Sequence, residues 1–334
     1  MQIGLWGKLD DSYLSLIRQL GVTGALYWGI KPPEGRDVID YLELVNLKAR
    51  YNDAGLELFT LENLGNQAQF YDPIILGWAQ RDEKIEQIAD CIRIMGQVGI
   101  PHFGFHWMVA PQPVGTNPVF GTSHSTRVRG DATVRSFDLE KAKDARLFRD
   151  RDYAEEEIWS NFDYFVKALL PVAEEAGVKL SLHPDDPPIP TFGGIPRLFG
   201  TFEGFKRATE IADSPNIGVC LCVGCWLEGG AAGMGVDVVE AIRWFGERDK
   251  LFKVHFRNVS NPMPEPWQET FIDDGYQDMY AVMRALREVG FDGAVIPDHI
   301  PEMVNGSDSG LAYSIGYMRA LVQAVNNEHA ATAG

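Results

Sequence analysis

The sequence lacks any apolar run long enough to cross a bilayer, although 45% of its 334 residues are hydrophobic. Its opening residues, MQIGLWGKLDDSY, lack the basic segment, apolar stretch and small-residue cleavage site of a secretory signal. Basic side chains are also few, because 30 Lys and Arg face 47 Asp and Glu, for a formal net charge of −17. Such a surface repels a nucleic-acid backbone. We therefore expect a cytoplasmic protein with no nucleic-acid and no membrane partner.

Cysteines are scarce and unevenly placed. Of the four, Cys220, Cys222 and Cys225 lie within six residues, and Cys91 stands alone in a helical pattern. This distribution is not a disulfide framework. Three thiols in an extended run also converge poorly on one ion, and no second cysteine cluster exists. A structural zinc or iron–sulfur site is therefore disfavoured.

Nucleotide-binding motifs are absent too, since no G-x-G-x-x-G follows the first apolar run and no G-x-x-x-x-G-K-[ST] occurs. What the chain does contain is an alternation of short apolar runs with longer amphipathic segments. The predicted strands are residues 2–6, 23–28, 56–61, 102–107, 178–183, 217–223, 251–256 and 293–297. This alternation predicts an α/β protein with a (β/α)8 TIM barrel, and the missing G-x-G-x-x-G weakens the rival doubly wound sheet.

The segments between the strands have the marks of helices packed on a sheet. In residues 155–175, apolar side chains recur at helical spacing after three glutamates that suit a helix N-terminus. Five of the predicted strands follow a glycine that fits a left-handed helix C-cap. These are Gly21, Gly55, Gly99, Gly177 and Gly290. We predict one barrel domain over residues 1–327 and a flexible tail over 328–334.

Residues 108–150 interrupt this repeat and have no clear hydrophobic period. They are rich in proline and glycine at first, and then contain Arg127, Arg129 and Arg135. A loop of this length is either a functional cover or partly disordered. Basic side chains in an acidic protein suit a cover over an anionic ligand, although ordinary surface charge explains them equally well.

Side chains that can bind a metal occur at the C-terminal ends of four predicted strands, where barrels of this kind carry their catalytic residues. The candidate ligands are His183, Cys222, His255 and Asp298. Each has an ordinary structural explanation when taken alone, such as a buried thiol or a turn-capping carboxylate. Together, two imidazoles, a thiolate and a carboxylate form a four-ligand site for a divalent ion. The thiolate favours Zn or Fe over Mg, but these ligand types do not select one metal.

Further polar residues surround these candidates. Arg257 can hold a substrate carboxylate through paired N–H groups or belong to a structural ion pair, and the sequence does not decide between them. In HPDDPP, residues 183–188, Asp185 and Asp186 either orient groups around the metal or form a turn before the stiff Pro187–Pro188 pair.

Six motifs resemble the successive signatures of D-mannonate dehydratases, which belong to the xylose-isomerase-like TIM barrels. They are HPDDPP at 183–188, GGIPR at 193–197, GVCLCVGC at 218–225, HFRNV at 255–259, DMYAVMRAL at 278–286 and PDH at 297–299. HPDDPP and PDH are the most specific. The resemblance extends over most of the chain, including GVTGALY and AGLEL near the N-terminus.

The resemblance implies conversion of D-mannonate to 2-keto-3-deoxy-D-gluconate in glucuronate breakdown, with Mn²⁺ or Fe²⁺ as the metal; Zn²⁺ also suits the thiolate. It implies the four candidate ligands named above, with His299 as an acid/base residue and Tyr313 as a second one. The chemistry suits these side chains. Proton removal beside a carboxylate creates an enolate-like dianion that a cation stabilises, and the hydroxyl that leaves needs a general acid, His299 or Tyr313.

Three features depart from the family pattern and bear on the substrate. WQETFIDDGYQDM, residues 267–279, lacks the usual histidine, Ile300 replaces a glycine, and the Arg-rich segment 127–135 differs. A metal-dependent sugar isomerase, epimerase or other carbon–oxygen lyase on the same scaffold is the alternative. A sugar-binding protein without catalysis is a third, against which the four ligands and His299 argue. Large enzymes of this fold often form dimers or tetramers, so we expect a homo-oligomer.

Overall fold

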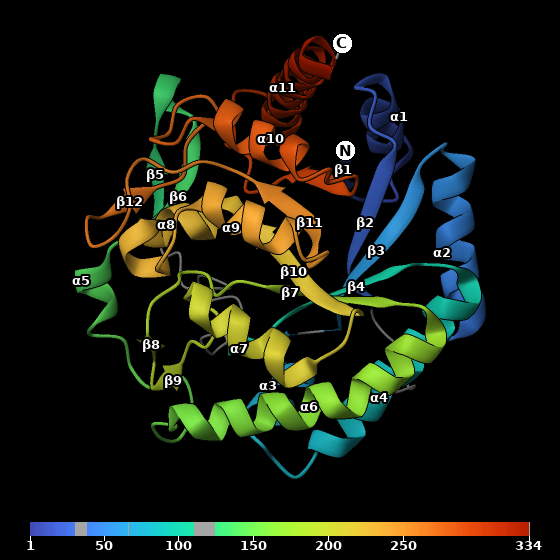
Figure 1. Ribbon diagram of the computed structural model, residues 1–334, viewed down its shortest axis with the longest axis vertical. Helices are drawn as coiled ribbons and strands as arrows, with labels where there is room; N and C mark the ends of the chain where they lie inside the picture. Colours follow the sequence, from blue (N-terminus) through green and yellow to red (C-terminus); the bar gives the residue numbers. More distant parts are fainter. Residues whose placement is uncertain (31–38, 66, 110–123, 334) are drawn as a thin grey trace.

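The computed structural model describes residues 1–30, 39–65, 67–109 and 124–333. Its centre is a closed barrel of parallel strands in the order β1-β13-β11-β10-β7-β4-β3-β2, ringed by helices (Figure 1). The barrel strands are β1 Gln2–Trp6, β2 Gly24–Ile30, β3 Glu57–Leu64, β4 His102–His106, β7 Lys179–His183, β10 Ile217–Cys222, β11 Leu251–Phe256 and β13 Ala294–Pro297. The predicted TIM barrel and its eight strands are confirmed.

The helices lie outside the ring of barrel strands (Figure 1). They are α1 Asp11–Gln19, α2 Tyr41–Asp53, α3 Gln67–Ile75, α4 Arg81–Val98, α5 Leu139–Ala142, α6 Glu155–Ala176, α7 Phe202–Ala212, α8 Val223–Met234, α9 Val238–Gly246, α10 Met279–Glu288 and α11 Ser307–Ala333. In α6, Ile158, Phe162 and Phe165 are fully buried, as their helical spacing predicts. All five predicted glycine caps have a positive φ, which confirms them. Helix α11 includes residues 328–333, where we predicted a flexible tail.

The segment 108–150, which has no clear period in the sequence, contains regular structure in its described part. Its residues 110–123 lie outside the described residues, but β5 His124–Arg127 and β6 Thr133–Phe137 form an antiparallel hairpin. A tight turn over Arg129–Asp131 joins the two strands. Strand β6 also pairs with β12 Trp267–Gln268, which follows barrel strand β11 in the chain. The sequences of these two strands, HSTR and TVRSF, lack the apolar runs of the barrel strands, which is why we predicted a loop.

Two charged side chains meet inside the barrel. Lys253 on β11 and Glu62 on β3 form an ion pair between Nζ and Oε2, and neither side chain is more than 1% exposed. Gly104 on β4 makes room for this pair, because a Cβ atom there would collide with the Glu62 carboxylate. The barrel strands therefore leave a space of the right size for the two paired charges in the barrel interior.

The remaining short strands, β8 Thr191–Phe192 and β9 Ile195–Pro196, form a small hairpin after β7. None of the described helices has both the length and the apolar composition needed to cross a membrane.

Candidate metal centre and active site

The four predicted ligands lie at one end of the barrel because of the strand register. His183 and Cys222 are the last residues of β7 and β10, and Asp298 directly follows β13. Cys222 stands opposite His255 in the pairing of β10 with β11. All four side chains are buried, with at most 8% exposed. Parallel strands thus bring together residues that are far apart in the sequence.

Neighbouring donor atoms among these residues lie close to one another. His183 Nε2 lies 3.2 Å from His255 Nδ1, which lies 3.9 Å from Asp298 Oδ2. Cys222 Sγ lies 3.8 Å from the same Asp298 oxygen. Donor atoms of Cys222, His255 and Asp298 form one group that could hold a metal ion, all within 4.8 Å of one another.

The chemistry of this donor set fits a metal ion. His183 Nδ1 lies 2.7 Å from the Pro184 carbonyl oxygen, to which it can donate, so that its Nε2 faces His255 Nδ1 with a lone pair. Together with a thiol and a carboxylate, these rings form a set suited to a divalent transition metal.

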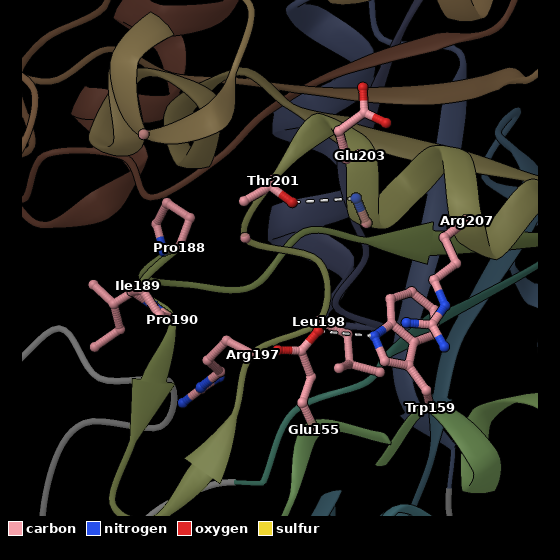
Figure 2. Close-up of a pocket in the computed structure, with 13 residues that line it drawn as sticks. Glu155, Trp159, Pro188, Ile189, Pro190, Arg197, Leu198, Thr201, Glu203 and Arg207 are labelled. Atoms are coloured by element: carbon pink, nitrogen blue, oxygen red, sulfur yellow. Dashed lines mark hydrogen bonds between the residues drawn. The ribbon is translucent and has the colours of Figure 1, made fainter. Parts of the chain in front are cut away.

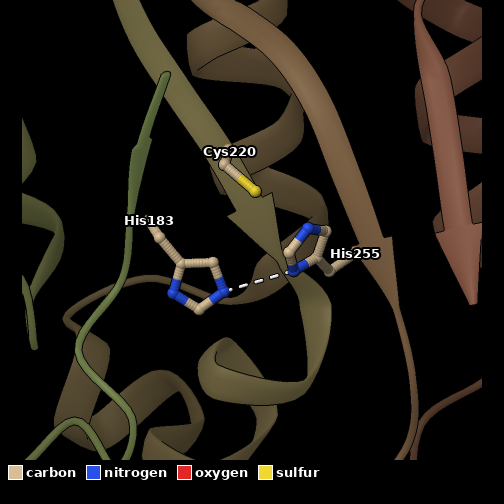
Figure 3. A group of neighbouring side chains, drawn as sticks. All are labelled: His183, Cys220 and His255. Atoms are coloured by element: carbon tan, nitrogen blue, oxygen red, sulfur yellow. Dashed lines mark hydrogen bonds between the residues drawn. The ribbon is translucent and has the colours of Figure 1, made fainter. Parts of the chain in front are cut away.

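A second thiol lies next to the two histidines. Cys220, two residues before Cys222 on β10, places its sulfur in a group with His183 and His255 (Figure 3). Burial raises the pKa of Cys220 well above its ordinary value. Burial acts in the same direction on Cys222, but its hydrogen bond with Cys225 and the charge of Arg257 lower its pKa well below the ordinary value. The surroundings therefore favour a thiolate at Cys222 rather than at Cys220.

Arg257 lies among carboxylates and is only 2% exposed. Its Nε donates to Asp298 Oδ2 at 3.1 Å, its Nη2 donates to Asp186 Oδ2 at 3.1 Å, and its Nη1 lies 2.6 Å from Glu228 Oε1. Glu269 Oε1 is 3.7 Å from the same Nη1. Of the two alternatives for this residue, the contacts favour the structural ion pair, because these protein carboxylates already surround the guanidinium.

The candidate acid/base residue His299 is paired with a carboxylate. Its Nδ1 lies 2.5 Å from Glu269 Oε1, a buried side chain on the segment after β12. Its Nε2 lies 3.4 Å from Nη1 of Arg135 on β6. Burial lowers the pKa of His299, but the Asp298 and Glu269 carboxylates outweigh it and raise that pKa. His299 has a φ of 45°, a left-handed conformation that is uncommon outside glycine.

Tyr313, the other candidate acid/base residue, lies on α11 and is partly exposed. Its hydroxyl accepts a hydrogen bond of 3.3 Å from Arg129 Nη2, and Arg129 also binds Asp273 at 2.8 Å. Within the described residues, no hydrogen bond joins Tyr313 to His299 or to a candidate ligand. Burial and a hydrogen bond to Asp273 raise the pKa of Tyr313. The role of Tyr313 stays a prediction.

The two aspartates of HPDDPP have different partners. Asp185 Oδ2 accepts a 2.7 Å hydrogen bond from the backbone N–H of Phe199, and Oδ1 lies 3.4 Å from Arg197 Nη1. Burial raises the pKa of Asp185 to about 6. Asp186 binds Arg257 instead. Asp185 therefore holds the following GGIPR segment against the loop, whereas Asp186 connects the loop to the residues around the candidate metal site.

Sequence reasoning missed several residues of the site. His106 ends β4 beside His183, with ring centroids 4.1 Å apart, and its Nδ1 lies 3.0 Å from Asn63 Nδ2. A polar residue at a strand end is the signal used for His183, so His106 was open to prediction. Glu228 and Glu269 carry no such signal, because they lie on a helix and on a connecting segment.

A cavity of about 370 Å³ lies outside this centre (Figure 2). It is bounded by the first turns of α6 and α7 and by the proline-rich end of HPDDPP, with Glu155, Trp159, Pro188 and Thr201 in its lining. None of the candidate ligands lines it. This cavity is therefore separate from the candidate metal centre.

Comparison with known proteins identifies the family of this chain. The family model for D-mannonate dehydratase (UxuA) matches residues 1–126 and 132–332. The mannonate dehydratase of Streptococcus agalactiae serotype V is 30% identical over 96% of this chain and 94% of its own. Mannonate dehydratase 2 of Halalkalibacterium halodurans is 27% identical over 95% and 94%.

Solved structures share the fold of this chain. The mannonate dehydratase of Streptococcus suis serotype 2 superposes with a TM-score of 0.83 at 26% identity, covering 98% of this chain and 96% of its own. An L-ribulose 3-epimerase shares the fold, with a TM-score of 0.62 at 14% identity over 100% of this chain and 98% of its own. The chain belongs to the D-mannonate dehydratase family and is thus a hydro-lyase.

Proposed function

We propose that this enzyme eliminates water from D-mannonate and releases 2-keto-3-deoxy-D-gluconate, with a divalent metal held by His183, Cys222, His255 and Asp298. The observation that carries the proposal is the arrangement of four buried donor side chains beside the paired His299 and Glu269. The family is metal-dependent. Mn²⁺ or Fe²⁺ is the metal that we propose, and Zn²⁺ also suits the thiolate.

The residues around the donors have distinct parts in this reaction. The bound metal would supply positive charge at the substrate carboxylate, where the charge of the enolate-like species accumulates. Arg257 fixes Asp298 and Asp186 in place through its hydrogen bonds and is a positioning residue. Glu269 Oε1 accepts a hydrogen bond from Nδ1–H of His299, which leaves Nε2 as the ring nitrogen that can exchange a proton with the substrate.

His299 moves a proton at Nε2. Elimination removes the C2 proton and the C3 hydroxyl of the sugar acid, and the resulting enol becomes the 2-keto group when a proton is added at C3. His299 is the side chain that we assign to one of these transfers, and Tyr313 remains our candidate for the other.

Arg135 is our candidate for the substrate carboxylate. Of the three arginines predicted to cover an anion, Arg129 is paired with Asp273 and Arg127 lies 3.7 Å from Asp131. Arg135 forms no salt bridge with a carboxylate among the described residues, and its Nη1 is next to His299. The Arg135 guanidinium can donate hydrogen bonds to the carboxylate of a sugar acid, which would bring the substrate next to His299.

The test is release of a 2-keto-3-deoxy acid from D-mannonate with Mn²⁺ or Fe²⁺. A His299→Gln variant should keep its metal and lose about 100-fold or more in kcat. His102→Gln is a matched control, because His102 is the first residue of β4 and lies at the other end of the strand from His106. Metal binding without turnover of any aldonate would contradict the proposal and favour a sugar isomerase or epimerase.

A further inference from the structure

Cys225 is a buried thiol that the proposed reaction does not use. It belongs to the C-x-x-C sequence Cys222-Val-Gly-Cys225, at the junction of β10 and α8. Cys222 is the N-cap residue of α8, and Cys225 lies in its first turn. The side chain of an N-cap residue faces the residue three positions later, as in a capping box. A C-x-x-C pair at a helix N-terminus is an arrangement found in proteins that cycle between dithiol and disulfide.

The structure brings the two sulfur atoms together. Cys222 Sγ, Cys225 Sγ and a nitrogen of His183 lie within 4.8 Å of one another. The side chains are fully buried and neither forms a disulfide. Two sulfurs at most 4.8 Å apart, on residues three positions apart at a helix start, are placed to form a disulfide after rotation of their side chains.

We propose that Cys222 and Cys225 are a thiol-oxidation site that forms a disulfide when the metal is absent, which removes the thiolate from the metal centre. The consequence for the metal rests on the proposed function, because it requires Cys222 to be a ligand. Formation of the disulfide rests only on the positions of the two sulfurs.

The other cysteines are poorly placed to compete. Cys91 lies on α4 and belongs to none of the groups formed by the other three. Cys220 and Cys222 are two residues apart on one strand, where Cα atoms are about 6.6 Å apart, near the upper limit for a disulfide. The pair across the helix start is therefore the favoured one.

Hydrogen peroxide is the oxidant in the proposed step. The Cys222 sulfur attacks one peroxide oxygen, the O–O bond breaks, and the other oxygen leaves as water with the thiol proton. The product is a sulfenic acid. The Cys225 sulfur then attacks the Cys222 sulfur, the S–O bond breaks, and the hydroxyl leaves as water with the proton of Cys225. Two thiols are oxidised to one disulfide, and one peroxide is reduced to two waters.

The metal should oppose this oxidation. A sulfur that donates its lone pair to a metal ion is less available to attack peroxide, so the loaded enzyme should keep both thiols. Conversely, the disulfide leaves only His183, His255 and Asp298 as candidate ligands. The oxidised protein should bind Zn²⁺ at least ~100-fold more weakly than the reduced protein.

Peptide mapping tests the proposal directly. Reduced, metal-free protein is treated with one equivalent of hydrogen peroxide in the presence of a chelator, alkylated and digested with trypsin. Residues 208–243 form one tryptic peptide that contains Cys220, Cys222 and Cys225. We expect this peptide to take up one alkyl group instead of three, with fragmentation placing the group on Cys220 and dithiothreitol restoring all three.

Variants and the metal separate the two parts of the proposal. Cys225→Ser should abolish the crosslink and still bind Zn²⁺, whereas Cys220→Ser, the matched control, should still form it. Three alkyl groups after oxidation of the wild-type protein, or a crosslink to Cys220, would overturn the disulfide site. A crosslink that forms equally fast with Zn²⁺ bound would instead overturn the role of Cys222 as a ligand.

Discussion

Replacing Arg135 by glutamine should lower kcat/KM for D-mannonate without loss of metal. The guanidinium is exposed, its Nη1 is 3.4 Å from His299 Nε2, and no described carboxylate forms a salt bridge with it. A hydrogen bond to a charged group contributes about 1.5–3 kcal/mol, and solvent exposure favours the lower half of that range. A loss of about 1.5–2 kcal/mol corresponds to a decrease in kcat/KM of about 10- to 30-fold.

The assay compares the wild type with Arg135→Gln, Arg135→Lys and Arg127→Gln on D-mannonate, with metal content measured in each. Arg127 is a matched control from the same hairpin, since it is exposed and lies near Asp131. The lysine variant should lose less than the glutamine variant, because it keeps the charge but not the paired N–H groups. The inhibition constant of the alditol that corresponds to D-mannonate, which lacks the carboxylate, should be the same in all four proteins.

Two results would refute the reasoning. If Arg135→Gln and Arg127→Gln lose activity equally, then general surface charge is responsible rather than a contact beside His299. If Arg135→Gln weakens the neutral alditol as much as the acid, the side chain supports the shape of the site and does not bind a carboxylate.

Three other perturbations have expected outcomes. Glu269→Gln should lower kcat by about 100-fold at unchanged metal content, because His299 loses its carboxylate partner, and an unchanged kcat would argue against the pairing. Lys253→Met leaves the Glu62 carboxylate buried without its partner and should cost about 3–5 kcal/mol in urea unfolding of the metal-free protein. Adding Glu62→Leu should recover most of that loss, whereas additive losses would contradict the pairing. Removal of metal with EDTA should abolish turnover and Mn²⁺ or Fe²⁺ should restore it, so activity that survives chelation would exclude a metal-dependent reaction.

Much of the fold could be predicted because it depends on local patterns. Short apolar runs alternate with amphipathic segments, and a parallel sheet with helices on its outside is the arrangement that buries both. The β5–β6 hairpin was missed because its strands, HSTR and TVRSF, lack an apolar run and because β6 pairs with β12, which is distant in the sequence. Tertiary pairing of this kind leaves little periodic signal in the chain.

The candidate ligands were predictable for a related reason. His183 and Cys222 end their strands, and the closed barrel brings strand ends to one mouth. Glu269 was not predictable, since it follows a two-residue strand and reaches His299 only through the fold. The same holds for Arg135, which a pattern search cannot distinguish from its neighbours Arg127 and Arg129.

The sequence by itself determined the barrel, its strand order along the chain and the kinds of donor atom at one rim, because these follow from periodicity and from the residue at each strand end. Only the tertiary structure decided which charges neutralise one another. In the folded protein Arg257 lies among carboxylates, Arg135 lies beside His299, and Cys225 lies close to Cys222. Such pairings depend on distances of a few ångströms between side chains from different strands and loops, where the Coulomb energy changes steeply and the order of residues gives no distance.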